Sequence, residues 1–200
     1  MTVIDSPPKT LSTPLNIKRW SIDDYHKMDE LGLLGLEERT ELIAGQITIM
    51  AAKGVPHVSA VRFLAIQLDD FLRDREFFVI TQDPVQLDDL SEPEPDLVIV
   101  RGDAFTYVNR HPQPKDIALI VEVADSTLRY DCEVKEKLYA QSNLTEYWVV
   151  DLKNRQLHIF QQPTPEGYNS HLILGENNQV SPLAFPKLAI ETSSILPPTA

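Results

Sequence analysis

Apolar residues recur along the chain with two different spacings, which predict helices and strands in turn. From His57 to about Arg75 they lie three and four residues apart, a spacing typical of an amphipathic helix of roughly five turns. The segments 96–100, 117–123 and 146–151 are apolar at almost every position. Strands with this composition lie in the middle of a sheet that is covered on both faces.

Further elements follow from the same pattern. Ser21, with Asp24 three residues later, predicts the start of a short packing helix. A second long helix is expected from Asp131, its N-cap, to about Ser142. The remaining segments predict a strand at 77–87 that a proline interrupts, a hairpin within 41–50 that turns at Gly45 and Gln46, and a hairpin around the turn-forming residues 163–167.

The order of the main elements is helix, three strands, helix and strand, with extra strands at both ends. It predicts a fold of the α/β (α+β) class, in which a mixed β-sheet is flanked by helices. Residues 17–200 are expected to form a single domain, because a chain of 200 residues corresponds to about one domain. Residues 1–16, rich in proline, serine and threonine, are predicted to be a flexible tail.

Composition and charge limit the cellular locations and the kinds of partner that we expect for this protein. The longest apolar runs fall far short of the roughly 20 residues of a membrane span. The first residues also lack the pattern of a secretory signal, so we expect no membrane and a cytoplasmic location. The single cysteine, Cys132, cannot form an intramolecular disulfide, which agrees with a reducing compartment. The chain has 18 basic and 30 acidic residues, and the resulting net charge of −12 opposes broad binding to nucleic acid.

The most informative charge is Glu122, which lies within the apolar strand 117–123. Burying an unpaired carboxylate is costly, so this side chain needs a cation, a metal ion or a hydrogen-bonding partner. Pairing with Arg129 at the edge of the sheet is the structural alternative. Asp96 begins the preceding apolar strand, directly after Pro95. Two adjacent strands that each carry one inward carboxylate can place two oxygen ligands close together, as a hard divalent cation requires.

A lysine on the second predicted long helix provides a third candidate. At about 100° per residue, counted from Val134, Lys135 falls between Leu138 and Tyr139 on the apolar arc. Lys137 lies off that arc and is expected to be solvated. An inward lysine could act in a site, or its aliphatic chain could extend along the helix to reach water. The helical angle alone favours neither interpretation.

Two further residues have ordinary interpretations when they are taken alone. Glu41 begins a predicted strand and is expected to be exposed there. His57 stands at the start of the long helix, where an imidazole often caps the helix or remains exposed. The other four histidines lack the spacing of metal ligands, so we expect no zinc site. Motifs for nucleotide binding and serine hydrolysis are absent from the sequence as well.

Several of these segments together resemble the Uma-two family of putative restriction endonucleases, a branch of the PD-(D/E)XK nuclease-like superfamily. The resemblance covers nearly everything from Trp20 to about Phe160. It rests on ELIAGQI at 41–47, the proline and histidine at 56–57, PDLVIV at 95–100, LIVEVADST at 119–127 and YDCEVKEKLYAQSNLTEYWVVD at 130–151.

The resemblance implies a restriction-endonuclease-like fold and hydrolysis of phosphodiester bonds in nucleic acid, with DNA as the expected partner. Asp96 and Glu122 match the family's metal-binding acids and would bind Mg²⁺, or Mn²⁺ as a substitute, together with the carbonyl oxygen of Val123. The third motif position holds Ala124 where the superfamily has lysine. Lys135 matches the lysine that the family retains on the following helix.

Two more residues join the expected catalytic set through the resemblance. Glu41 matches the family's upstream acid, and His57 matches its histidine near the start of the long helix. Lys135 would then orient the attacking water or help to deprotonate it. We also expect a homodimer, since double-strand cleavage is often performed by symmetric pairs.

Two other function classes remain open at this point. A non-catalytic interaction protein could retain the nuclease fold, but it has no physical need for three charged groups near its core. Two carboxylates could also hydrolyse a sugar substrate by metal-free acid–base chemistry, which leaves the inward lysine unexplained.

Overall fold

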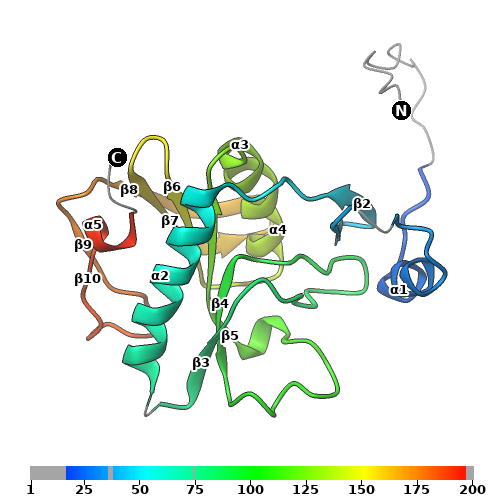
Figure 1. Ribbon diagram of the computed structural model, residues 1–200, viewed down its shortest axis with the longest axis horizontal. Coiled ribbons are helices and arrows are strands. Elements are labelled where there is room, and N and C mark those ends of the chain that lie inside the picture. Colours follow the sequence, from blue (N-terminus) through cyan, green and yellow to red (C-terminus); the bar gives the residue numbers. More distant parts are fainter. Residues whose placement is uncertain (1–16, 36–37, 74, 197–200) are drawn as a thin grey trace.

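A six-stranded mixed sheet forms the centre of the computed structural model, which describes residues 17–35, 38–73 and 75–196 (Figure 1). Neighbouring strands are antiparallel except for the central pair β5–β6, which is parallel. This arrangement confirms the predicted fold class. The predicted tail, residues 1–16, lies outside the described residues. In spatial order the strands are β3 (Phe77–Ile80), β4 (Leu97–Arg101), β5 (Ile117–Ala124), β6 (Glu146–Asp151), β7 (Gln156–Thr164) and β8 (Gly167–Leu174).

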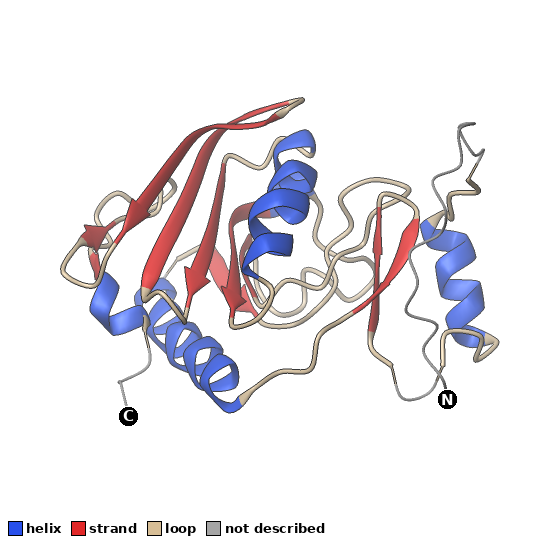
Figure 2. Cartoon of the chain, turned by 90° about the horizontal axis from the view of Figure 1, so that it is seen from above, coloured by secondary structure: helices blue, strands red, loops and turns tan. Residues whose placement is uncertain are grey.

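The side chains of a strand alternate between its two faces, so the apolar central strands build two separate cores. On one face, Leu97 and Val121 pack with the long helix α2 (Val55–Leu72). On the other face, Ile120 packs with the helical segment 128–141. Figure 2 shows these helices on opposite sides of the sheet. Burial on both faces explains why the central strands are apolar at nearly every position.

The expected N-terminal hairpin forms a small sheet of its own beside the main one. It consists of β1 (Thr40–Ile43) and β2 (Gln46–Ile49). The turn lies at Ala44 and Gly45, whose φ angles are 49° and 78°, and therefore one residue before the predicted position. Two positive φ angles are typical of the tight two-residue turn of a hairpin.

The predicted strand at 77–87 is too long. β3 ends at Ile80. Gln82 then adopts a φ of 58°, which turns the chain out of the sheet, and Pro84 has no amide hydrogen to continue the ladder. The residues that follow instead form a loop that leads to β4.

The second helical segment starts earlier than predicted and is irregular. It begins at Leu128, so Asp131 is not its N-cap. A wide π-helical turn, Asp131–Lys135, joins α3 (Leu128–Tyr130) to α4 (Glu136–Gln141). An angle of 100° per residue does not apply in such a turn.

The irregular turn changes the helical face that the sequence pattern indicated. Val134, from which the apolar arc was counted, is 42% exposed. Lys135 is nevertheless buried, and Lys137 is exposed as expected.

Short elements complete the chain. Helix α1 begins after Ser21, the predicted start of the helix, and Ser21 forms a capping box with Asp24. No helix within the described ranges is long and apolar enough to cross a membrane. The short elements are α1 (Ile22–Glu30), η1 (Pro114–Asp116), β9 (Gln179–Val180), β10 (Ile190–Glu191) and α5 (Thr192–Ile195).

Candidate active site

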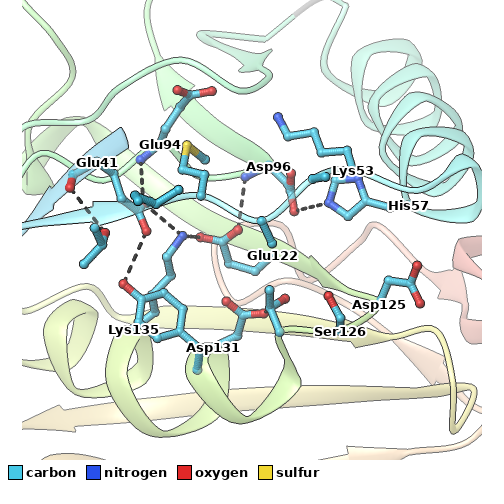
Figure 3. A pocket seen from close by; sticks show the side chains of 17 residues that line it. Glu41, Lys53, His57, Glu94, Asp96, Glu122, Asp125, Ser126, Asp131 and Lys135 are labelled. Atoms are coloured by element: carbon cyan, nitrogen blue, oxygen red, sulfur yellow. Dashed lines mark hydrogen bonds and ion pairs between the residues drawn. The ribbon is translucent and has the colours of Figure 1, made fainter. Parts of the chain in front are cut away.

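A cavity of about 220 Å³ lies where the hairpin, the start of α2 and the second helical segment meet the ends of β4 and β5 (Figure 3). It brings together five residues that are far apart in the sequence and that were all candidates for catalysis. They are Glu41, His57, Asp96, Glu122 and Lys135. The fold therefore assembles the complete candidate set at one place.

Asp96 and Glu122 lie side by side on adjacent strands. Leu97 is opposite Val121 in the antiparallel pair β4–β5, which brings Asp96 next to Glu122. The amide of Asp96 donates a hydrogen bond to Glu122 Oε2 at 3.3 Å. The amide of Val123 donates to Asp96 Oδ2 at 2.9 Å. The structure thus places two buried carboxylates next to each other, whereas metal binding through the Val123 carbonyl stays a prediction.

Glu122 is paired with groups from the second helical segment. Lys135 Nζ donates to Glu122 Oε1 at 2.8 Å and lies 3.2 Å from Glu41 Oε2. Tyr139, four residues after Lys135, donates its hydroxyl to the same Glu122 oxygen at 2.9 Å. Arg129 pairs elsewhere, so the predicted structural alternative for Glu122 is wrong. Lys135 points into the cavity and does not extend along the helix to water.

The protonation of this cluster follows from burial and from the two donors on Glu122. Burial raises the pKa of Glu122, Lys135 opposes that rise, and Asp96 adds to it. Burial disfavours the charged form of Lys135, but Glu122 and Glu41 together hold its pKa above the ordinary value. We assign the proton of the pair to Lys135, because Glu122 Oε1 receives both the ammonium and a hydroxyl hydrogen. A lysine that keeps its proton does not deprotonate water.

Glu41 is buried, which contradicts its interpretation as an exposed residue at a strand start. It is only 4% exposed. In addition to the ion pair with Lys135, it accepts hydrogen bonds from the Tyr130 hydroxyl and the Glu94 amide, each at 3.3 Å. A carboxylate with several donors is well suited to a buried position.

His57 is buried as well and does not remain exposed at the start of its helix. Its Nε2 lies 2.9 Å from Asp96 Oδ2. Burial alone would raise the pKa of Asp96, but the hydrogen bond and charge of His57 and the amide of Val123 hold it below the ordinary value. Asp96 is therefore ionised at neutral pH and fixed in orientation.

Sequence reasoning missed three residues of this region. Asp131 lines the cavity, accepts a hydrogen bond from the Thr127 hydroxyl at 2.6 Å, and has its pKa raised to about 6 by burial. Asp131 and Tyr139 each stand four residues from Lys135, a spacing that could have indicated them. Lys53 also lines the cavity. It lies in the loop before α2, where no periodic pattern could have indicated it.

Asp96 and Glu122 are the side chains of the cavity that could hold a hard divalent cation, and metal binding stays a prediction. Asp96 and Glu122 present carboxylate oxygens to a cavity with room for water. Mg²⁺ commonly uses one or two carboxylates and keeps several water ligands, whereas structural zinc takes four protein ligands. In the part of the chain that the structure describes, no group of three or more His, Cys, Asp or Glu side chains is arranged to hold a metal ion.

The charge of the cavity also favours cations. Six acidic side chains line it, against two lysines and one histidine. An anionic substrate would be repelled from such a surface unless a cation accompanies it. The cavity therefore lacks the basic character of a groove that binds nucleic acid through its own side chains.

The chain is similar to a known protein family in sequence and to a solved structure in fold. The model of the Uma-two family, described as putative restriction endonuclease, matches residues 22–193. The crystal structure of a putative nuclease from Anabaena variabilis is similar, with a TM-score of 0.63 and 11% identity, covering 88% of this chain and 96% of that chain. None of the curated proteins matches. Because the family match spans most of the sequence and includes every residue of the cavity, the chain belongs to the Uma-two family of putative restriction endonucleases.

Proposed function

We propose that this protein is a Mg²⁺-dependent nuclease that hydrolyses phosphodiester bonds of nucleic acid, with DNA as the expected substrate. The observation that supports this proposal is the pair of adjacent carboxylates, Asp96 and Glu122, next to a buried lysine in one cavity. Mg²⁺, or Mn²⁺ in its place, would be held by these two side chains and the Val123 carbonyl. When bound, it would supply charge stabilisation at the phosphate and would lower the pKa of water.

The residues around the carboxylates then have positioning roles. His57 orients Asp96 through the 2.9 Å hydrogen bond. Lys135 holds Glu122 and Glu41 together and keeps its own proton, so it fixes the carboxylates and balances part of their charge. Preorganised groups of this kind need no rearrangement when the substrate binds.

The buried ion-pair cluster argues against an interaction protein that only retains the nuclease fold. Burying charges costs desolvation energy, and apolar side chains of similar volume would give equal or greater stability. Folding alone therefore does not require three buried charges, yet Glu41, Glu122 and Lys135 are each less than 10% exposed. The largely acidic lining of the cavity also favours a substrate that contacts the protein over a short length.

Calorimetric titration with Mn²⁺ and Mg²⁺ tests the proposal, together with a nuclease assay on single-stranded, duplex and structured substrates. The double variant Asp96→Asn with Glu122→Gln should lose metal binding and activity while it remains folded, because both changes keep the shape of the side chains. The control is Asp69→Asn with Glu30→Gln, which removes the same charge at exposed positions outside the cavity. Equal Mn²⁺ affinity in the double variant and the wild type would contradict the metal site.

Two finer expectations accompany the proposal. The homodimer expected from double-strand cleavage can be measured by sedimentation of the wild-type chain. The cytoplasmic location stays a prediction from the sequence.

A further inference from the structure

Lys53 differs from Lys135, the other lysine of the cavity, in its surroundings. Its Nζ is buried and forms no hydrogen bond with the residues that the structure describes. Glu94, which lines the same cavity, pairs with Arg39 instead. Lys135, by contrast, is held by Glu122 and Glu41. The cavity thus contains one lysine that is committed to carboxylates and one that is available to a ligand.

The two lysines approach the carboxylate pair from different sides. In Figure 3, Lys53 extends over Asp96 from the side of His57, whereas Lys135 reaches Glu122 from the opposite side. Lys53 and Lys135 also come from unrelated parts of the chain, the loop before α2 and the π-helical turn. Lys53 therefore lies on the side of the carboxylate pair that Lys135 does not occupy.

The loop that carries Lys53 packs closely against the cavity where it enters α2. Gly54 follows directly, and a Cβ at that position would lie 3.0 Å from Asp125 Oδ2. The glycine therefore lets the loop pass close to Asp125, which also lines the cavity. Gly54 is also the N-cap of α2, and its carbonyl accepts the amide of Val58 at 3.1 Å. The positive end of this 18-residue helix, which has no acidic residue in its first turn, adds to the charge of Lys53.

An unpaired ammonium in a buried position is unfavourable unless an anion satisfies it. Burial lowers the pKa of Lys53, the charge of Arg39 lowers it further, and Asp96 opposes both. A bound anion would restore the interactions that the amine lacks. In a cavity that is otherwise rich in carboxylates, this amine is a specific contact point for a negatively charged ligand.

We propose that Lys53 is the residue that contacts the substrate phosphate, through a non-bridging phosphate oxygen, in the cavity of Asp96 and Glu122. This assignment rests on the proposed nuclease function and adds the residue that recognises its substrate class, a phosphodiester. Lys135 then positions the carboxylates, and Lys53 binds the phosphate.

The experiment uses Lys53→Met and Lys53→Arg in the full chain. Binding of a phosphorothioate analogue of the dinucleotide TpT, in the presence of Mg²⁺, is measured by calorimetry, and hydrolysis of bis(p-nitrophenyl) phosphate is measured in parallel. Lys53→Met should bind the dinucleotide at least about tenfold more weakly, because it loses a charge-assisted hydrogen bond. Mg²⁺ affinity should be equal or higher, because a positive charge near Asp96 is removed. Lys53→Arg keeps the charge and should recover most of the dinucleotide affinity.

The matched control is Lys137→Met, an exposed lysine outside the cavity, which should bind as the wild type does. Dinucleotide binding by Lys53→Met within twofold of the wild type would overturn the assignment, as would a wild type that does not bind the dinucleotide. A Lys53→Arg variant as weak as Lys53→Met would overturn it too. If the wild type binds through Lys53 but hydrolyses no phosphodiester, the nuclease proposal fails and the phosphate contact stands.

Discussion

Replacing Lys135 by methionine tests whether its ammonium holds the carboxylates of the cavity in place. Its Nζ lies 2.8 Å from Glu122 Oε1 and 3.2 Å from Glu41 Oε2, and its side chain is only 6% exposed. Methionine keeps most of the aliphatic volume, so the change removes a charge without opening a large cavity. Removing one partner of a buried ion pair costs about 3–5 kcal/mol, because the other charge remains buried without compensation.

We therefore expect Lys135→Met to lower the free energy of unfolding by about 3–5 kcal/mol at pH 8. For a chain of this size, that loss corresponds to a decrease in Tm of roughly 6–20 °C. The loss should become smaller toward pH 5, because burial raises the pKa of Glu122 and a proton on this carboxylate then removes the uncompensated charge. Urea unfolding followed by circular dichroism at both pH values measures the difference between variant and wild type.

Two further variants separate the charge from the packing. Lys137→Met lies on the same helical segment but is exposed, and it should change the free energy of unfolding by less than about 0.5 kcal/mol. Adding Glu122→Gln to Lys135→Met should recover part of the loss, since the amide oxygen still accepts the Tyr139 hydroxyl without carrying a charge. An unfolding free energy of Lys135→Met equal to that of the wild type at pH 8 would refute the buried ion pair. A loss of equal size at pH 5 and pH 8 would refute its electrostatic origin.

Two other variants probe the buried carboxylates by urea titration. Glu41→Gln should lower the free energy of unfolding by about 1–2 kcal/mol, because the Tyr130 hydroxyl and the Glu94 amide bond to different carboxylate oxygens and the single amide oxygen can keep only one of them. Glu41→Ala loses both acceptors and should cost about 2–4 kcal/mol, so equal losses would contradict this reasoning. Asp131→Asn should leave the free energy of unfolding unchanged at pH 4 and should raise it by up to about 3 kcal/mol at pH 8. The size follows because each unit of difference between the folded and unfolded pKa corresponds to about 1.4 kcal/mol. The sign follows because burial raises the pKa of Asp131 from 3.8 to about 6, so the wild type loses stability as the pH rises between these values. An equal effect of Asp131→Asn on the free energy of unfolding at pH 4 and pH 8 would argue against a buried carboxylate.

The sequence by itself determined the central sheet and the helix order. Strands such as 117–123 are apolar at almost every position because both faces are covered, and this composition is visible without knowledge of any partner strand. The same reasoning indicated Glu122 and Asp96, because a charge within an apolar strand contrasts with its neighbours. The inward direction of Lys135 was also predicted, although the angle that supported it does not apply to the π-helical turn.

Tertiary structure alone decided which polar residues share the cavity. His57 meets Asp96 across 39 positions, and Tyr130 meets Glu41 across 89 positions of the sequence. Periodicity reports which face of an element is apolar, but it carries no information on which other element will cover that face. Taken alone, Glu41 and His57 were therefore expected to be exposed, and only the family resemblance placed them in the catalytic set. Lys53 was not recognised. A residue in a loop or at an element's end is buried only when another part of the chain packs over it, and that packing is a property of the complete fold.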